Sequence, residues 1–254
     1  MAGAKDIVVV KDLTKVYDKK PVVDGISFTV KQGEVFGILG PNGAGKTTTL
    51  EMIETLREID GGSATIDGID VASNPYAIRG IIGVQPQAPA FQEKTKLTEI
   101  LEQFSSIYGD KINPKEFLAE VGLEDKANSY VEQLSGGQKQ RFSIVTALVH
   151  NPKVFFLDEP TTGLDPQARR NLWDLIEEVR GRGISVILTT HYMDEAEVLC
   201  DRIAIMDRGK IIALDTPKNL IKALLKRGFT KKQHVEQANL EDVFIDLTGK
   251  ELRA

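Results

Sequence analysis

Residues 40–49 read GPNGAGKTTT and follow the apolar stretch EVFGIL at residues 34–39. Glycines let backbone N–H groups turn inward, because no Cβ blocks their approach to a ligand. Amide groups at the start of a helix, together with a lysine ammonium, favour a negatively charged group such as a phosphate. The stretch therefore predicts a phosphate-binding loop between a strand and a helix, with a glycine-rich surface turn as the alternative.

The loop matches the pattern G-x-x-x-x-G-K-[ST] through Gly40, Gly45, Lys46 and Thr47. In that pattern the lysine reaches the β- and γ-phosphates of a nucleotide, and the hydroxyl holds Mg²⁺. We therefore expect the chain to bind a nucleoside triphosphate with Mg²⁺. The loop residues expected to contact the nucleotide are Gly40, Pro41, Asn42, Gly43, Ala44, Gly45, Lys46, Thr47 and Thr48.

A second stretch, VFFLDEP at residues 154–160, supplies the acidic groups that such a loop requires. Its apolar half reads as a buried strand, and ligands of open α/β sheets bind beyond the carboxyl ends of the strands. Asp158 is predicted to hold the hydration shell of Mg²⁺. Glu159 is predicted to polarise a water for attack on the γ-phosphate. The alternative is a pair of surface acids at the end of a strand.

Stretches typical of strands and of helices alternate along the chain. IVVVKDL, ISFTV, EVFGIL, VFFLDEP and ISVILTT read as strands, and SATIDGIDV reads as a short hairpin. Leu50, Ile53, Glu54 and Leu56 have helical spacing, which predicts a helix up to the break at residues 60–62. This alternation predicts an α/β fold with a mainly parallel sheet.

The middle of the chain, residues 95–150, has a sequence pattern typical of helices. Apolar residues there fall at the intervals of one helix face: Leu97, Ile100, Leu101, Phe104 and Ile107. Ser135 with Gln138 three residues later fits a capping box at the start of a helix. A later helix is predicted to begin at Pro166 and to end at Gly181.

Composition limits the classes of function. The 254 residues carry a net charge of −5, and the basic cluster KRGFTKK at residues 226–232 reads as a surface turn, so we expect no nucleic-acid partner. The single cysteine, Cys200, excludes an intrachain disulfide. We expect no signal peptide, and no apolar run approaches the roughly 18 residues that cross a bilayer. A role at a membrane would therefore require a partner.

The stretch LSGGQKQR at residues 134–141 distinguishes among nucleotide-binding families. Together with the phosphate loop and VFFLDEP, it resembles the ATP-binding cassette (ABC) ATPases, whose signature is LSGGQ. The resemblance implies a P-loop NTPase fold of the ABC type, with a mainly parallel core sheet, an antiparallel β-subdomain and a helical subdomain inserted at about residues 88–150. It implies an ABC ATPase domain over residues 1–225 and a short C-terminal helical extension over residues 226–254.

In that family two cassettes close head to tail around two ATP molecules. The resemblance implies that the signature residues Ser135, Gly136, Gly137 and Gln138 bind the ATP held by the partner cassette. Asp165 resembles the residue of the D-loop that crosses the dimer seam, and it is also a candidate N-cap of the following helix. A copy of this chain or a homologue could serve as the second cassette.

Three further residues are assigned by the resemblance. Gln87 resembles the glutamine of the Q-loop, which contacts Mg²⁺, although Gln85 competes for this role. His191 resembles the switch histidine that contacts the γ-phosphate. Tyr17 resembles the aromatic residue that stacks on adenine, with an ordinary strand residue as the alternative, since stacking needs only a flat ring.

Residues 191–220 resemble ATPase subunits of ABC-2 type exporters of drugs, polysaccharides and lipids. Residues 240–252, LEDVFIDLTGKEL, resemble the C-terminal segment of the same branch, or form an ordinary packing helix. The implied function is ATP hydrolysis that drives export through a separate membrane permease, with the chain on the cytoplasmic face of the membrane. The alternatives are a soluble ABC ATPase, such as one of iron–sulfur assembly, and a nucleotide-gated binding module without catalysis.

Overall fold

The computed structural model describes residues 5–87, 89–109 and 111–229. The chain divides into two units after Leu220, so the described part of the second unit is residues 221–229. The strands are β1 (Asp6–Tyr17), β2 (Lys20–Lys31), β3 (Val35–Leu39), β4 (Gly61–Ile66), β5 (Ile69–Asp70), β6 (Ile82–Gln85), β7 (Val154–Asp158), β8 (Ser185–Thr190), β9 (Arg202–Asp207) and β10 (Lys210–Asp215). The helices are α1 (Lys46–Ile53), α2 (Pro75–Arg79), α3 (Leu97–Ile107), α4 (Pro114–Glu120), α5 (Gly136–Ala147), α6 (Pro166–Gly181), α7 (Met193–Leu199) and α8 (Pro217–Lys226), with short 3₁₀ turns η1 (Glu124–Lys126) and η2 (Val131–Gln133).

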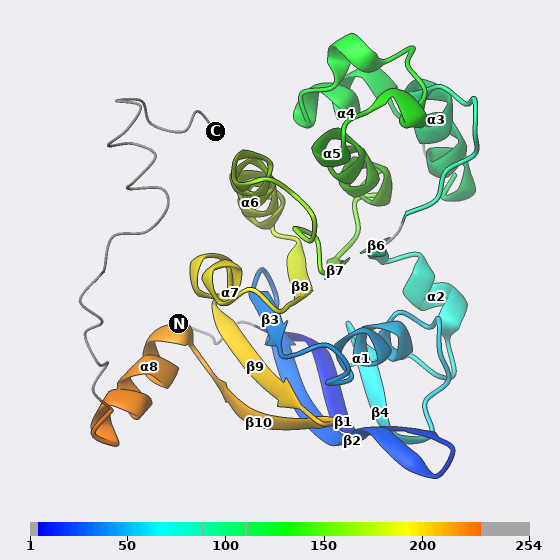
Figure 1. Ribbon diagram of the computed structural model, residues 1–254. Helices are drawn as coiled ribbons and strands as arrows, with labels where there is room; N and C mark the ends of the chain where they lie inside the picture. Colours follow the sequence, from blue (N-terminus) through cyan, green and yellow to red (C-terminus); the bar gives the residue numbers. More distant parts are fainter. Residues whose placement is uncertain (1–4, 88, 110, 230–254) are drawn as a thin grey trace, which may run out of the picture. The chain divides into compact units, whose positions relative to one another are not determined.

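The core sheet of the first unit has the strand order β10-β9-β3-β8-β7-β6 (Figure 1). The pairs β9–β3, β3–β8, β8–β7 and β7–β6 are parallel, and β10 adds antiparallel to β9. Every residue of β3, β7 and β8 is buried. Strands that are covered on both faces read as continuous apolar runs, which is why EVFGIL and VFFLDEP were recognisable as core strands. The predicted mainly parallel sheet is confirmed.

A second sheet, in the order β2-β1-β4-β5, is antiparallel throughout. SATIDGIDV forms its hairpin β4–β5, with Ile66 opposite Ile69. One face of the sheet is apolar: Val8, Val10, Phe28 and Val30 are buried in a cluster shared with α1. This sheet is the antiparallel β-subdomain that the ABC resemblance implied.

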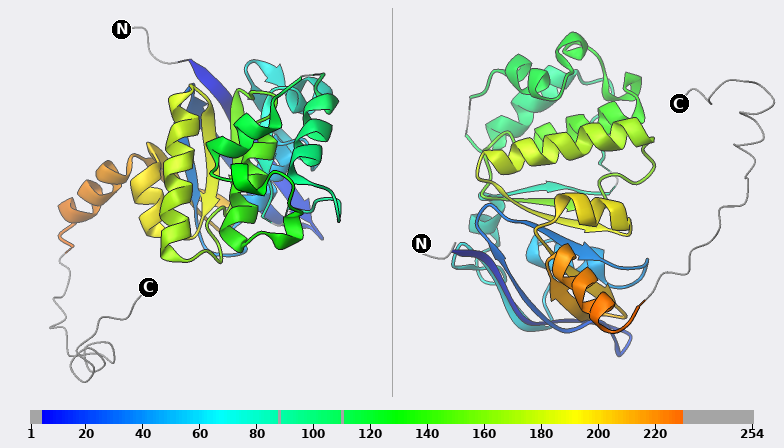
Figure 2. Two further views of the ribbon diagram at one scale, coloured as in Figure 1. Left: turned by 90° about the horizontal axis from the view of Figure 1, so that it is seen from above. Right: turned by 90° about the vertical axis from the view of Figure 1, so that its left-hand side faces the viewer.

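The segment between β6 and β7 is helical, as predicted. Helices α3, α4 and α5 contact one another and form a layer apart from the antiparallel sheet (Figure 2). Leu97, Ile100 and Leu101 of α3 are buried, but Ile107 is 74% exposed and does not belong to the packed face. The helix ends at Ile107, so the apolar face stops short of the predicted length. The capping box of α5 is present, with Ser135 and Gln138 bonding each other's backbone N–H groups.

Helix α1 is shorter than its sequence pattern predicted. It ends at Ile53, and Leu56 lies beyond it with 65% of its surface exposed. Thr55 adopts a left-handed backbone with φ of 65°, and the N–H groups of Leu56 and Arg57 both turn back to the Glu51 carbonyl, at 2.8 and 3.0 Å. The left-handed residue breaks the helix before the predicted glycine break, and Leu56 is thereby directed to the surface.

Helix α6 agrees with its prediction at both ends. Asp165 is its N-cap and accepts a hydrogen bond from Ala168 N at 2.8 Å. The helix ends at Gly181, and Gly183 follows with φ of 83°. Its predicted core face is buried: Leu172, Leu175, Ile176 and Val179. The start of α6 is therefore fixed directly after the predicted D-loop.

The second unit is described only to residue 229. Helix α8 crosses the boundary between the units at Leu220–Ile221. The segment LEDVFIDLTGKEL at residues 240–252 and most of the predicted C-terminal extension lie outside the described residues. The predicted end of the ATPase domain at residue 225 therefore stays a prediction. Within the described part of the chain, no helix is both long enough and apolar enough to cross a membrane.

The first unit contains a buried acidic side chain at the end of α1. Glu54, which caps the end of α1, is only 5% exposed. Burial, together with the nearby carboxylates of Asp158 and Glu51, raises the pKa of its carboxyl group to about 8. Glu54 is therefore neutral in the folded protein at neutral pH, whereas it ionises in the unfolded chain.

This difference predicts a pH-dependent stability. As pH rises from 5 to 8, unfolding releases the proton of Glu54, so the free energy of unfolding of the nucleotide-free protein falls. We expect Glu54→Gln to gain stability relative to wild type over this range, by a few kcal/mol at most, because one pKa unit corresponds to about 1.4 kcal/mol. Urea unfolding in EDTA at pH 5.5 and 8.5 measures this. The matched control is Glu58→Gln, at an exposed carboxyl group, and an equal pH dependence in both variants would contradict the assignment.

Candidate functional site

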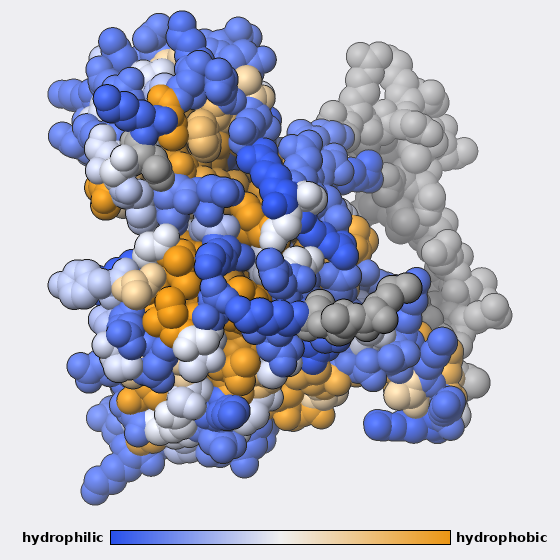
Figure 3. Space-filling model, turned by 180° about the vertical axis from the view of Figure 1, so that it is seen from behind, coloured by the Kyte–Doolittle hydropathy of each residue, from blue (hydrophilic) through white to orange (hydrophobic). Residues whose placement is uncertain are grey.

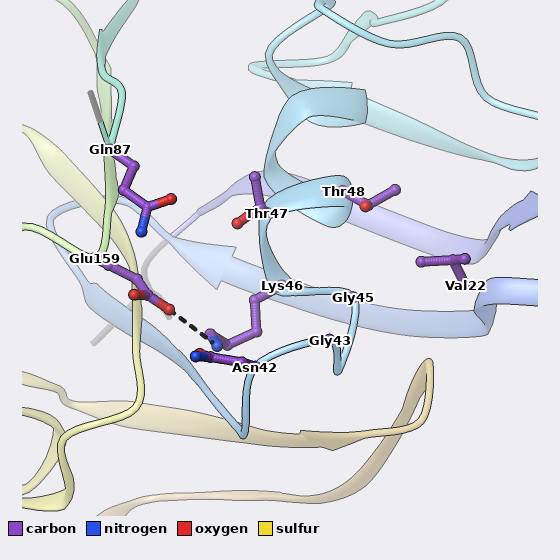
Figure 4. Close-up of a pocket in the computed structure, with 9 residues that line it drawn as sticks. All are labelled: Val22, Asn42, Gly43, Gly45, Lys46, Thr47, Thr48, Gln87 and Glu159. Carbon is purple, nitrogen blue, oxygen red and sulfur yellow. Dashed lines mark ion pairs between the residues drawn. The ribbon is translucent and has the colours of Figure 1, made fainter. Parts of the chain in front are cut away.

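A polar cavity of about 350 Å³ opens where α1 begins. It is lined by Val22, Asn42, Gly43, Gly45, Lys46, Thr47, Thr48, Gln87 and Glu159. Figure 4 shows Glu159 and Gln87 facing the loop that carries Lys46 and Thr47. Residues from the phosphate loop, from the end of β7 and from the segment after β6 thus meet at one place. Val22, on β2, is a half-buried lining residue that the sequence did not point to, since in the sequence it resembles any other apolar strand residue.

The loop before α1 has the backbone that a phosphate cradle requires. Gly43 and Gly45 are left-handed, with φ of 79° and 101°. A Cβ at Gly40 would lie 2.2 Å from the Met206 carbonyl oxygen, so only glycine fits beside β9. Helix α1 has neither a side-chain cap nor an acidic residue in its first turn. Its N-terminal N–H groups and positive dipole end therefore suit an anionic ligand.

Lys46 is buried at the base of the cavity, with 4% of its surface exposed. Its Nζ donates to the carbonyl oxygens of Gly40, at 2.9 Å, and Pro41, at 3.2 Å. It also lies 3.2 Å from Oε1 of Glu159. A buried ammonium is stable only when it is paired, and here the loop and Glu159 together provide the partners.

Thr47 and Asp158 meet at the side of the cavity. Thr47 Oγ1 lies 3.0 Å from Oδ2 and 3.2 Å from Oδ1 of Asp158. Asp158 is also held by a hydrogen bond from the Thr189 hydroxyl on the neighbouring strand β8. A hydroxyl and a carboxylate are the hard oxygen donors that Mg²⁺ prefers, so the residues present fit the predicted metal.

Glu159 is placed by an unusual backbone. Its φ is 47°, in the left-handed region, and its N–H donates to both the carbonyl and the hydroxyl oxygen of Thr189. Its carboxylate lies between Lys46 Nζ at 3.2 Å and Nδ1 of the His191 imidazole at 3.3 Å. Burial opposes ionisation, but these two groups outweigh it and hold the pKa of the carboxyl below its usual value. Glu159 is therefore ionised, as a general base must be.

The two candidate glutamines, Gln85 and Gln87, have different environments in the structure. Gln87 lines the cavity. Gln85 is fully buried at the end of β6, and its Nε2 donates to the Pro86 carbonyl at 2.6 Å. Gln87 is thus the residue brought to the site.

Tyr17 does not contribute to the lining of the cavity. Its ring lies between Lys15 and Arg57, whose cationic groups are 5.6 and 5.7 Å from the ring centroid, and its hydroxyl accepts a hydrogen bond from Arg57. The ring is 37% exposed at the turn between β1 and β2. Stacking of Tyr17 on adenine stays a prediction.

The signature and D-loop residues form a second cavity, of about 520 Å³. Ser135 and Asp165 are the N-caps of α5 and α6, and both line it. Gly136, Gly137 and Gln138 also line it, and none of its lining residues lines the first cavity. Two helix N-termini that open into one polar cavity favour an anion. The chain therefore has two separate cavities into which helix N-termini open.

Comparison with known proteins agrees with this arrangement. Residues 23–162 match the family model described as "ABC transporter". The chain belongs to the ABC transporter ATPase family. It is therefore an ATP-binding ABC ATPase, and the fold of the first unit is that of an ABC cassette.

The sequence similarity to known relatives extends over most of the chain. The linearmycin resistance ATP-binding protein of Bacillus subtilis is 41% identical over 219 residues, which cover 84% of this chain and 70% of the relative. The Nod factor export ATP-binding protein I of Burkholderia pseudomallei is 43% identical over 218 residues, covering 84% and 72%. Among solved structures, an ATP-binding subunit of an ABC transporter is 31% identical with a TM-score of 0.79, covering 95% of this chain and 99% of that one.

The buried position of Lys46 leads to a prediction for nucleotide binding. Lys46→Ala removes the cation at the base of the cradle and leaves Glu159 without its ammonium partner, so the site becomes more negative. We expect ATP affinity to fall at least about tenfold, since hydrogen bonds to charged groups are worth about 1.5–3 kcal/mol. Isothermal titration with Mg-ATP measures this. Lys20→Ala, at an exposed strand position, is the control, and unchanged affinity in Lys46→Ala would exclude Lys46 from the site.

Proposed function

We propose that this chain is the ATP-hydrolysing subunit of an ABC exporter and that two cassettes close head to tail around two Mg-ATP. The proposed dimer is supported by the separation of the two cavities. The phosphate loop and Glu159 line one of them, and the N-termini of α5 and α6 line the other. Each cavity supplies half of the contacts that an enclosed triphosphate needs, so a second cassette would complete both sites.

The hydrolytic roles follow from the contacts around Glu159. Its carboxylate pairs with Lys46 at 3.2 Å. When Lys46 turns to the phosphates of ATP, the carboxylate is released and can orient the attacking water as general base. His191, 3.3 Å from the same carboxylate, would contact the γ-phosphate. Thr47, Asp158 and Gln87 would hold Mg²⁺, which supplies charge neutralisation of the phosphates when it is bound.

Reopening of the dimer couples this chemistry to movement. ATP favours the closed pair because it contacts both cassettes there, whereas the products of hydrolysis lose the contacts with one of them. A solved ABC cassette that is 27% identical to this chain, with a TM-score of 0.74 and coverage of 82% and 98%, is described as a dimer in a post-hydrolysis state with ADP and phosphate. That relative supports the same cycle for this chain.

The permease contact is proposed at an apolar groove between the helical subdomain and the core sheet. Two adjoining hollows of about 210 and 170 Å³ share Val84, Phe104, Thr146 and Ala147, and Leu56 lines the larger one. Figure 3 shows apolar side chains gathered where this face is hollowed. Relatives named for linearmycin resistance and Nod factor export support an exporter partner. The chain would then work on the cytoplasmic face of the membrane, bound through the permease.

Trapping the closed dimer tests the catalytic half of the proposal. Glu159→Gln keeps the shape of the side chain but removes the base, so we expect ATP turnover to fall at least about 100-fold. ATP should then hold the variant as a dimer in size-exclusion chromatography with light scattering. Adding Ser135→Arg, which fills the second cavity, should restore the monomer. A Glu159→Gln variant with wild-type turnover would remove Glu159 from the mechanism.

Co-purification from native membranes tests the permease. We expect the tagged chain to retain a polytopic membrane protein in detergent, and Leu56→Glu in the groove to lose it without losing ATP binding. Ile212→Glu is the matched control, because Ile212 is equally exposed, at 65%, but lies on β10 outside the groove. Recovery of soluble partners alone would reject the exporter and favour a soluble ABC ATPase.

A further inference from the structure

The segment after His191 is attached to helix α6 at two points. The guanidinium carbon of Arg169 lies 4.5 Å from the centroid of the Tyr192 ring, and its Nη1 donates to Asp194 at 3.3 Å. One turn further along α6, the indole N–H of Trp173 donates to Oε1 of Glu195 at 3.3 Å. Glu195 is completely buried. The start of α7 is therefore tied to the first two turns of α6.

Tyr192 transmits this attachment to His191. The rings of the two residues are 4.1 Å apart between centroids, with 37° between their planes. The Tyr192 N–H donates to Thr190 Oγ1 at 2.9 Å, which fixes the backbone of the same segment at the end of β8. On its other side His191 faces the Glu159 carboxylate at 3.3 Å. Contacts therefore run without interruption from Arg169 through Tyr192 and His191 to Glu159.

The first turn of α6 connects this series to the second cavity. The Arg169 N–H donates to the Asp165 carbonyl at 3.0 Å, and the Ala168 N–H donates to the Asp165 side chain at 2.8 Å. Asp165 and Ala168 line the second cavity, whereas Arg169 does not. A displacement of the Asp165 turn would therefore carry Arg169 with it and change its stacking on Tyr192.

The packing of Arg169 shows that its stacking is specific. Its side chain is 22% exposed, and its Nε is buried without a hydrogen-bond partner among the described residues. A guanidinium over an aromatic face interacts more strongly when it is removed from water. Arg170, its neighbour in sequence, is exposed. Two adjacent arginines thus have different environments, and Arg169 is the one that stacks on Tyr192 and forms an ion pair with Asp194.

We propose that Arg169 is a positioning residue for ATP hydrolysis, which holds His191 against Glu159 through the Tyr192 ring and makes that placement depend on the Asp165 turn. This inference rests on the proposed function, in which His191 contacts the γ-phosphate and Asp165 faces the second cassette. It adds a physical route by which contact with a partner at one cavity changes the geometry of the hydrolytic residues at the other.

Steady-state kinetics of the purified chain provide the first test. Arg169→Met keeps the length of the side chain but loses the charge, and we expect kcat to fall about fivefold while KM for ATP changes less than about twofold. Arg169→Lys should restore most of kcat, because an ammonium can also lie over the ring. Arg170→Met is the matched control and should behave as wild type.

A double-variant comparison shows whether Arg169 acts through His191. In a His191→Ala background, Arg169→Met should lower kcat no further, because the group that it positions is gone. Independent losses that multiply would overturn the inference. If His191→Ala alone left kcat unchanged, the proposed role of His191 would fail instead, and the two failures are therefore distinguishable.

Imidazole NMR tests the placement without any catalysis. The chain has three histidines, so the ring signal of His191 is assigned by its loss in His191→Ala. Because the Tyr192 ring lies close to it, this signal reports the ring contact, and we expect it to move in Arg169→Met but not in Arg170→Met. A thermal unfolding curve checks that each variant is folded. An unmoved His191 signal in folded Arg169→Met would overturn the proposal.

Discussion

The parallel pairing of β3, β8 and β7 is the constraint on which the site depends. Leu39 lies opposite Thr190 and Asp158 opposite Thr189, so the three strands end at the same edge of the sheet. Gly40, Glu159 and His191 are the residues that directly follow these strand ends. Because the pairing sets their separation, the phosphate loop, the base and the histidine converge although more than a hundred residues separate the first two in sequence.

The same constraint explains how much of the protein could be predicted from its sequence. Strands buried on both faces read as apolar runs, and the loop, the acids and the signature are local patterns, so the fold and most site residues were recognisable. The end of α1 could not be predicted in this way, because it is decided by the left-handed backbone of Thr55 rather than by apolar spacing. Residues such as Val22 and Arg169 were also missed, since their roles arise only when distant elements pack together.

The helical subdomain and the core are joined around the site rather than at a distance from it. Gln87 leads from β6 into the helical segment, and Ser135 begins the helix α5 that returns toward β7. The apolar groove lies between these two layers, next to the buried carboxyl of Glu54. The groove and the nucleotide cavity share no lining residue, but a partner seated in the groove would contact the C-cap of α1 and the segment after β6, and both α1 and this segment also border the nucleotide cavity.

The contact between Lys46 and Glu159 has a consequence for anion selectivity. The lysine already has its own counter-ion, the Glu159 carboxylate, held within the protein at 3.2 Å. An incoming anion must displace the Glu159 carboxylate from Lys46. Its binding free energy from Lys46 is therefore only the difference between the two attractions. Inorganic phosphate, with few other contacts, gains little, whereas a nucleotide also contacts the amides of the loop. We therefore expect the internal counter-ion to discriminate against small anions, and a neutral side chain at position 159 to relax this discrimination.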